Sequence, residues 1–295
     1  MIKRTIEVSG PETRLFLRRG QIQVERKGEK IGQFPAEDTG VLIVDSPTTV
    51  YTHSTLTELI DRGAVVVLCG DDHLPHAVIT PTAANSLQTE RLAAQVSSKE
   101  PLRKRLWQQI VRAKIRNQAN NLDHYPEEKI RLEQLIPRVR SGDPANVEAQ
   151  ASRIYWPAWL EGRIFRRRRS GDPPNNLLNY GYAILRAAVA RAIAGSGLHP
   201  SIGLHHHSRY DSFCLADDLM EPLRPCVDRT VRELFQCGQD AINKDTKTEI
   251  LAVLMEPVEI DGNRGPLMVE LQKMTASLAA CFAGEEKKLR IPMVP

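Results

Sequence analysis

The chain has 295 residues, of which 41% are hydrophobic and 26% charged, and its formal net charge is +4. This composition provides enough apolar residues for a core and excludes a disordered or fibrous protein. The length predicts about two domains, and no apolar run approaches the roughly 20 residues that a membrane-spanning helix needs.

The N-terminal stretch MIKRTIEVSG has no apolar segment of the kind that secretory signals contain, so we expect a cytoplasmic protein without membrane association. The cysteines are odd in number, widely spaced and free of any CxxC pair: Cys69, Cys214, Cys226, Cys237 and Cys281. This pattern favours reduced thiols over disulfides or a structural zinc site.

Short strands dominate the chain up to Pro81. The stretch TRLFLRRGQIQVER predicts two strands that meet at Arg19–Gly20, and Gly28 marks a second turn. Further strands are predicted at 41–45, 65–69 and 77–80, with a short helix that ends at Gly63. We therefore predict a β-rich domain over residues 1–82.

Helical periodicity replaces this alternation from about residue 83. Apolar residues recur at helical spacing over 87–96, 101–122, 179–197 and 268–282. Another helix is predicted to begin with Asp143 as its N-cap and Pro144 at its first position. The expected fold class is α+β, with a small N-terminal β-rich domain followed by a larger all-α domain over 83–295.

Three consecutive histidines precede a run of acids in GLHHHSRYDSFCLADDLMEP. Adjacent side chains point in different directions, so His205, His206 and His207 cannot all bind one ion, and a structural or surface histidine is the default interpretation of each. Asp218 and Glu221 would share a helix face, where their charges repel unless a cation lies between them. A solvated helix face is the alternative. Carboxylates with one imidazole suit Mg²⁺ or Mn²⁺ better than structural zinc.

Glu148 is a third candidate acid. It lies among Ala145, Val147, Ala149 and Ala151, and small neighbours are unusual for an acid on a purely solvated face. An exposed surface glutamate explains the pattern equally well, so both interpretations remain open.

Basic residues gather in two stretches. EGRIFRRRRSGD contributes Arg163, Arg166, Arg167, Arg168 and Arg169, and LRKRLWQQIVRAKIR contributes Arg103, Lys104, Arg105, Arg112, Lys114 and Arg116. Four consecutive arginines repel one another, which favours an anionic partner such as the DNA backbone. For the second stretch, a solvated helix surface is an equally good interpretation.

The stretches NVEAQASRIYW, NLLNYGYAILRAAVARA and GLHPSIGLHHHSRYDSFCLADDLMEPLRP together resemble the CRISPR-associated protein one family, most closely the version found in type II systems. The resemblance covers essentially the whole chain. It implies that Glu148, His206 and Glu221 are catalytic and bind the metal, with Asp218 as a further acid on the metal side. His206 lies three positions after Gly203, as in the family motif, although the triple histidine leaves the register open by one residue.

The same resemblance implies a metal-dependent DNA endonuclease and integrase that inserts short foreign DNA fragments into a CRISPR array in adaptive immunity. Attack of a DNA 3′-hydroxyl on a phosphodiester needs stabilised phosphoryl charge and an activated oxygen, and Mg²⁺ or Mn²⁺ supplies both. The implied partners are double-stranded DNA, a second copy of the chain bound through the β-rich domain, and a dimer of CRISPR-associated protein two that bridges two such dimers. The type II effector nuclease and an accessory protein complete the implied set.

Two other classes of protein remain to be considered. A di-iron oxidase in a helical bundle would need Glu-x-x-His pairs, and the sequence contains none. A scaffold that shapes DNA while a partner performs the chemistry stays open, although the acid–histidine–acid set disfavours it.

Overall fold

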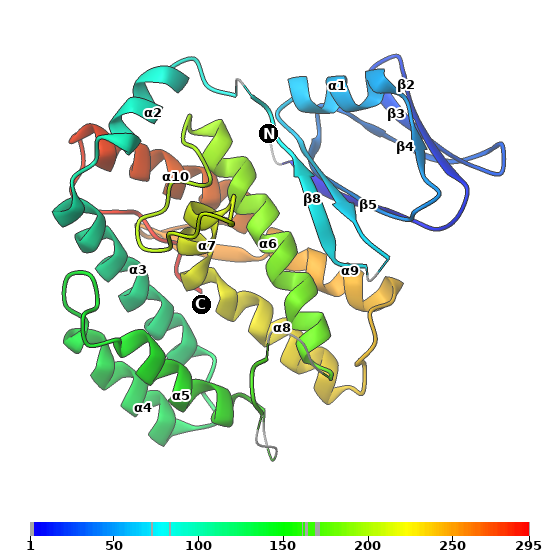
Figure 1. Cartoon of the computed structure of the whole chain (residues 1–295). Helices are drawn as coiled ribbons and strands as arrows, with labels where there is room; N and C mark the ends of the chain where they lie inside the picture. The colour runs from blue at the N-terminus through cyan, green and yellow to red at the C-terminus, as the bar shows by residue number, and fades with distance from the viewer. Residues whose placement is uncertain are drawn as a thin grey trace.

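The computed structural model describes residues 3–71, 73–82, 84–160, 162, 165–168 and 172–294. A β-rich N-terminal part lies against one side of a larger helical body (Figure 1). Strand β8 ends at Ile79 and helix α2 begins at Gln88, so residue 82 falls in the connection between them. The predicted α+β fold class is confirmed.

Two four-stranded sheets make up the N-terminal part. The first has the order β1-β5-β7-β8, in which β1, β5 and β7 are parallel, and the second has the order β4-β3-β2-β6. Their bounds are β1 Arg4–Ser9, β2 Thr13–Arg18, β3 Gln21–Arg26, β4 Glu29–Pro35, β5 Thr39–Asp45, β6 Val50–Tyr51, β7 Val65–Cys69 and β8 Pro75–Ile79. Helix α1 (His53–Asp61) contacts both sheets, and a core that includes Leu15, Leu42, Leu59 and Val66 joins them.

Both tight turns that the sequence predicted are present. Arg19–Gly20 and Lys27–Gly28 are two-residue loops between paired strands. All four residues have positive φ, between 52° and 83°, which is the geometry of the hairpin turns whose twist matches that of the strands. The sequence pattern did not predict β1 or β6, which lie at the edges of their sheets.

The C-terminal part is a group of helices around α6. The helices are α2 Gln88–Val96, α3 Glu100–Asn120, α4 Pro126–Leu135, α5 Val147–Trp159, α6 Asn175–Gly195, α7 Cys214–Met220, α8 Arg224–Gln236, α9 Lys244–Ala252 and α10 Leu267–Ala283. A short hairpin of β9 (Pro257–Ile260) and β10 (Asn263–Pro266) precedes α10. Within the described residues, no helix has the length and apolar character needed to cross a bilayer.

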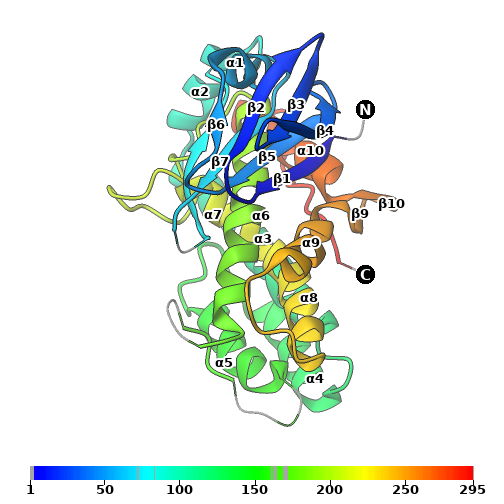
Figure 2. The same ribbon diagram turned by 90° about the vertical axis from the view of Figure 1, so that its right-hand side faces the viewer.

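Helix α6 is almost entirely buried and contacts both α7 and α8 on one side and the first sheet on another (Figure 2). A Cβ on Gly181 would lie 2.4 Å from Cγ1 of Val227, so the small residue lets α6 and α8 approach closely. Helix α6 therefore joins the β-rich part to the elements that carry the candidate site.

Helix α5 begins at Val147, not at Pro144 as predicted. Its N-cap is Asn146, whose side chain accepts a hydrogen bond from the N–H of Ala149. Asp143 stabilises the same turn, because its carboxylate oxygens accept hydrogen bonds from the N–H groups of Val147 and Glu148 at 2.9 and 3.0 Å. Two side chains thus satisfy the free N–H groups of the turn that carries Glu148.

Candidate active site

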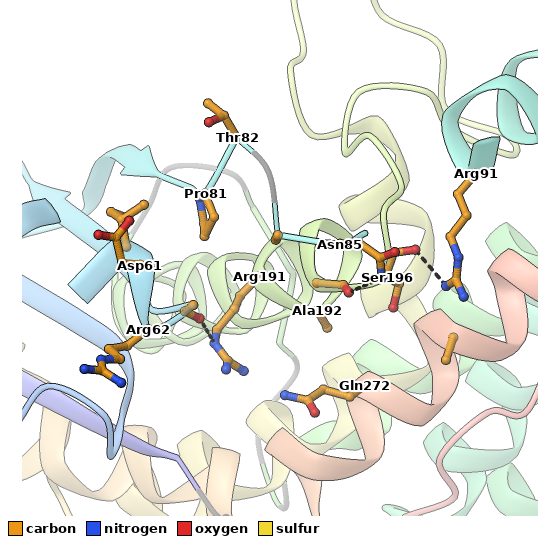
Figure 3. Close-up of a pocket in the computed structure, with 15 residues that line it drawn as sticks. Asp61, Arg62, Pro81, Thr82, Asn85, Arg91, Arg191, Ala192, Ser196 and Gln272 are labelled. Carbon is orange, nitrogen blue, oxygen red and sulfur yellow. Dashed lines mark hydrogen bonds between the residues drawn. The ribbon is translucent and has the colours of Figure 1, made fainter. Parts of the chain in front are cut away.

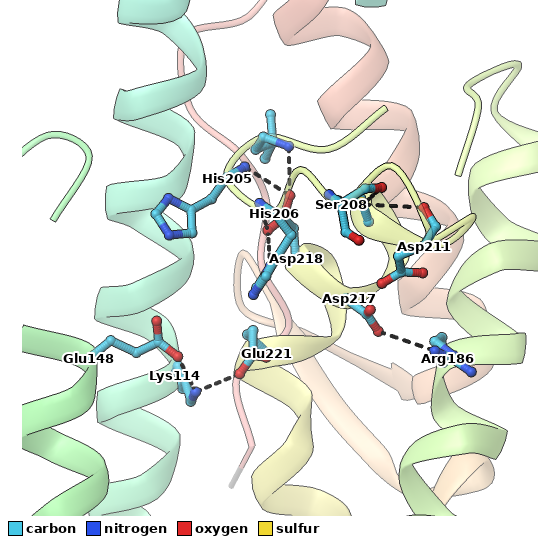
Figure 4. Close-up of polar contacts among 12 residues, drawn as sticks. Lys114, Glu148, Arg186, His205, His206, Ser208, Asp211, Asp217, Asp218 and Glu221 are labelled. Carbon is cyan, nitrogen blue, oxygen red and sulfur yellow. Dashed lines mark hydrogen bonds and ion pairs between the residues drawn. The ribbon is translucent and has the colours of Figure 1, made fainter. Parts of the chain in front are cut away.

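Glu148, His206 and Glu221 come together where α3, α5 and the segment joining α7 to α8 meet (Figure 4). Glu148 lies in the first turn of α5, and Glu221 begins the short 3-10 turn Glu221–Leu223. His206 lies in the loop that precedes α7. Three residues that the sequence singled out therefore form one cluster.

The ammonium group of Lys114, on α3, lies between the two glutamates. Its Nζ is 2.5 Å from Oε1 of Glu148 and 2.5 Å from Oε2 of Glu221. Burial alone would lower the pKa of Lys114, but the charges of Glu221 and Glu148 raise it, so the ammonium group is charged. A cation already lies at the point where the two carboxylates converge.

Arg224 holds the other oxygen of Glu221. Its Nε donates a hydrogen bond to Oε1 at 3.0 Å, and its guanidinium lies 4.6 Å from the centre of the Tyr182 ring. Burial alone would raise the pKa of Glu221, but Arg224 and Lys114 lower it to about 2. Glu221 is therefore ionised at neutral pH. Its buried Oε2 has no hydrogen bond of regular geometry within the described chain, and the Lys114 ammonium is its neighbour.

Asp218 orients His206. Its carboxylate is fully buried, and Oδ1 lies 2.7 Å from Nδ1 of His206. The same carboxylate accepts hydrogen bonds from the backbone N–H groups of Leu204, His205 and His206 at 2.6 to 3.2 Å. An acid at Nδ1 fixes the ring orientation and leaves Nε2 for a ligand. The resemblance implied that Asp218 lies on the metal side, whereas in this geometry its oxygens serve the loop and His206.

The loop that includes residues 203–207, here called the histidine loop, packs tightly against Asp218 and Trp107. A Cβ on Gly203 would lie 2.4 Å from the backbone oxygen of His206 and 2.9 Å from Oδ2 of Asp218, so only glycine fits there. The ring of His205 stacks on Trp107 with 4.3 Å between centroids, and His206 meets the same indole edge-on at 5.8 Å. Because His205 packs on Trp107 while His206 is held by Asp218, the geometry favours His206 as the functional imidazole.

Asp228, a fully buried acid on α8, links α8 to α5 and α6 through hydrogen bonds beside the site. Tyr155 on α5 donates a hydrogen bond to Oδ2 at 2.9 Å, and Tyr182 on α6 donates one to Oδ1. Burial raises the pKa of Asp228 to about 6, although both tyrosine hydroxyls lower it. Tyr155 is on the same helix as Glu148, and Tyr182 contacts Arg224, so this network helps to position both glutamates.

The described arginines of the first basic stretch, 166–168, differ in exposure. Arg166 and Arg168 are exposed. Arg167 turns inward, because it donates a hydrogen bond to Oδ1 of Asn179 at 2.6 Å and lies 5.2 Å from the centre of the Tyr182 ring. Arg163 and Arg169, which we also expected at the DNA surface, lie outside the described residues.

The second basic stretch is divided, because Lys104, Arg105 and Arg116 are exposed whereas its other three cations make contacts within the fold. Arg103 donates hydrogen bonds to the backbone oxygen of Ser98, and Arg112 donates one to that of Val139. Lys114 belongs to the glutamate cluster. For the three exposed cations, a DNA surface and a solvated helix face both remain open interpretations.

The donor set fits a hard divalent cation. Glu148 and Glu221 are carboxylates that converge on one positive charge, and Nε2 of His206 has no partner in the described part of the chain. Among the described residues, no three His, Cys, Asp or Glu side chains form a group that could hold a metal ion as they stand, and the Lys114 ammonium lies between the two glutamates. A divalent ion would therefore have to displace this ammonium group.

Comparison with known sequences agrees with this geometry. The family described as CRISPR associated protein Cas1 matches residues 6–258. The CRISPR-associated endonuclease Cas1 of Neisseria meningitidis serogroup C (strain 8013) is 36% identical over 286 residues, which cover 95% of this chain and 93% of that protein.

Solved structures share the fold at low sequence identity. A casposase bound to integration product superposes with a TM-score of 0.80 at 19% identity, over 98% of this chain and 92% of that chain. A Cas6–RT–Cas1–Cas2 complex gives a TM-score of 0.78 at 16% identity, over 97% of this chain and 35% of that chain. The family match and the identity to the Neisseria protein extend over most of the sequence, and the chain belongs to the Cas1 family.

Proposed function

We propose that this protein is a metal-dependent DNA endonuclease and integrase that inserts short foreign DNA fragments into a CRISPR array. The observation that carries the proposal is that the Glu148 and Glu221 carboxylates both contact the Lys114 ammonium, with the His206 imidazole held beside them by Asp218 (Figure 4). The Neisseria relative is named an endonuclease, and the similar casposase was solved with its integration product. Both names favour phosphodiester chemistry on DNA.

Glu148 and Glu221 would hold Mg²⁺ or Mn²⁺, with Nε2 of His206 as a third ligand or as a proton carrier beside them. The bound ion would stabilise negative charge on the phosphoryl oxygens and orient the reacting groups. Asp218 keeps the His206 ring in place through Nδ1. Arg224 engages one oxygen of Glu221 and leaves the other for the ligand position.

In the joining reaction, the 3′-hydroxyl oxygen of the donor forms a bond to a phosphorus atom of the CRISPR repeat. The donor hydroxyl gives up its proton as it attacks, the bond from that phosphorus to the 3′-oxygen of the repeat strand breaks, and the leaving oxygen takes up a proton. One phosphodiester replaces another, so no oxidant or external energy source is needed. Water in place of the donor hydroxyl gives strand cleavage.

The nucleophile is tested with donor DNA whose ends carry 2′,3′-dideoxy sugars. We expect donors with free 3′-hydroxyl groups to be joined to a CRISPR repeat in Mg²⁺ or Mn²⁺, and dideoxy donors to give no product, because they lack the attacking oxygen. A gel shift with each donor checks that both bind equally well. Product from the dideoxy donor would show that the 3′-hydroxyl does not attack directly.

The proposal extends to the partners of the reaction. We propose that the protein forms a homodimer through its β-rich part and that a Cas2 dimer bridges two such dimers on double-stranded DNA. The type II effector nuclease and an accessory protein would join this assembly. Support comes from the similar solved structure that is named as a complex of Cas1 with Cas2.

Arg166 and Arg168 are expected to bind DNA phosphates, because both are exposed. Replacing both with alanine should weaken duplex binding and reduce the slope of log K against log salt by about 1.8, since each phosphate that is no longer neutralised removes about 0.9. Fluorescence anisotropy over a salt series measures the slope. The matched control replaces Arg14 and Lys30, two exposed cations of the β-rich part, and should leave the slope unchanged. An unaltered slope in the first variant would remove these arginines from the DNA surface.

A further inference from the structure

A cavity of about 760 Å³ lies between the β-rich part and the helical body (Figure 3). Its walls come from the end of α1, the connection to α2, the end of α6 and one face of α10. Cavities of this size accommodate small ligands. None of its lining residues belongs to the glutamate–histidine cluster, so it is a separate site.

Arg191, on α6, is the buried charge of this cavity. The residue is only 9% exposed, and burial lowers the pKa of its guanidinium. Its Nε donates a hydrogen bond to the backbone oxygen of Gly63 at 2.8 Å, which uses one of five N–H groups. In the described part of the chain, no carboxylate lies within ion-pair distance of this guanidinium.

The neighbourhood of Arg191 is positive. Among the described residues of the lining, Arg62 and Arg91 add two further cations and Asp61 is the one acid. Lys3 lies nearby, where burial and the charges of Arg191 and Arg62 lower its pKa against the opposing charges of Asp38 and Glu37. Carbonyl groups at the ends of α1 and α6 offset part of this charge, since Gly63 accepts from Arg191 and Ser196 accepts from Arg91.

Gln272 of α10 supplies a polar group opposite the arginine. Its side chain and that of Arg191 extend toward each other across the cavity (Figure 3). Within the described residues, the two terminal nitrogens of Arg191 have no hydrogen-bond partner, so they can match the planar spacing of two phosphate oxygens, and an amide can donate to a third. A carboxylate has only two oxygens and a halide is a single atom, so neither would accept from both the guanidinium and the amide as completely as phosphate.

We propose that this cavity is a phosphate-binding site in which Arg191 is the main anchor and Gln272 the opposite wall. The phosphate belongs either to a small monoester such as a nucleotide or to the DNA backbone. Because the walls come from both parts of the chain, a bound phosphate would also fix their relative position.

Thermal unfolding of the full chain tests the site. Inorganic phosphate should raise the melting temperature of the wild type in a saturable manner, compared with sodium chloride of equal ionic strength, because a ligand that binds only the folded state stabilises it. Arg191→Gln should lose this shift. The exposed Arg14→Gln, on a distant strand, should keep it and controls for net charge.

A second variant separates ligand binding from the contact with Gly63. Gln272 is exposed, so Gln272→Glu leaves the fold and the Arg191–Gly63 bond intact while placing a carboxylate opposite the guanidinium. In chloride, this variant should have a higher melting temperature than the wild type, and phosphate should no longer raise that temperature. A phosphate shift that persists in both variants, or a wild-type shift that chloride reproduces, would overturn the proposal.

Two further probes distinguish the source of the phosphate. Deoxyadenosine monophosphate and a short DNA duplex are tested on the wild type and on Gln272→Glu. If Gln272→Glu loses the rise in melting temperature caused by the monophosphate but keeps the wild-type duplex affinity, the ligand is a small monoester. A matching loss of duplex affinity and of its salt dependence identifies the DNA backbone.

Discussion

Replacing Glu148 by glutamine is expected to slow metal-dependent cleavage and joining of DNA by on the order of 10³-fold or more. Several kcal/mol of transition-state stabilisation depend on a correctly held cation, and each 1.4 kcal/mol corresponds to about a factor of ten in rate. The amide has nearly the same shape as the carboxylate but no charge to hold the ion. Initial rates of joining at saturating donor DNA measure the loss.

Two controls accompany this substitution. Glu249→Gln alters an exposed acid on α9 in the same way and should leave the joining rate unchanged. Duplex affinity of Glu148→Gln should equal that of the wild type, because we expect the exposed arginines Arg166 and Arg168 to provide much of the binding. A variant that joins DNA at the wild-type rate would remove Glu148 from the active site.

Replacing Lys114 by methionine is expected to destabilise the metal-free protein by about 3–5 kcal/mol, the usual cost of removing one partner from a buried ion pair. Glu148 and Glu221 would lose the cation that they share, and only Arg224 would remain beside Glu221. Mn²⁺ should then recover most of the lost stability. Thermal unfolding in EDTA and in Mn²⁺, together with Mn²⁺ binding by calorimetry, measures both effects.

In the wild type, a divalent ion would have to compete with the Lys114 ammonium, so Lys114→Met should also bind Mn²⁺ more tightly. The surface pair of Lys129 and Asp123, 2.6 Å apart, offers the matched control. Lys129→Met should cost no more than about 1 kcal/mol and should respond to Mn²⁺ as the wild type does. If Lys114→Met stays equally unstable in EDTA and in Mn²⁺, the two glutamates do not form a cation site.

Local patterns were sufficient to predict most of the strands and helices. Gly20 and Gly28 marked two turns that require positive φ, and the change from alternating to helical periodicity near residue 83 separated the two parts of the chain. Edge strand β6, with only Val50 and Tyr51, is too short for an alternating pattern. The start of α5 was predicted too early because Asp143 behaves like a capping residue. It accepts hydrogen bonds from two N–H groups of the first turn, although the N-cap itself is Asn146.

The central lysine of the site was not predicted, because its role depends on tertiary contacts. In the sequence, Lys114 lies in a basic stretch that resembles a surface. Two buried residues that follow at helical spacing carry the signal that was missed, Asn117 on α3 and Asn121 at its C-cap. Asn117 donates a hydrogen bond to the backbone oxygen of Pro222 at 2.6 Å, next to Glu221. A polar stripe on an otherwise apolar helix face indicates a buried functional contact.

The role of Asp218 also depends on the folded loop. Spacing alone placed Asp218 and Glu221 on one face, and both do lie near His206. Which acid faces the cation position depends on the loop around Gly203, whose backbone approaches Asp218 within hydrogen-bond distance. No pattern within α7 contains that information.

Crystals of the protein soaked in Mn²⁺ would test directly whether Glu148, His206 and Glu221 bind one divalent ion. An anomalous difference map should show a peak within about 2.0–2.4 Å of both carboxylates and of Nε2 of His206, at the distances typical of such oxygen and imidazole ligands. The Lys114 ammonium should have moved away from the two glutamates. A Mn²⁺ peak elsewhere, with Lys114 still bridging Glu148 and Glu221, would show that these three residues do not form the metal site.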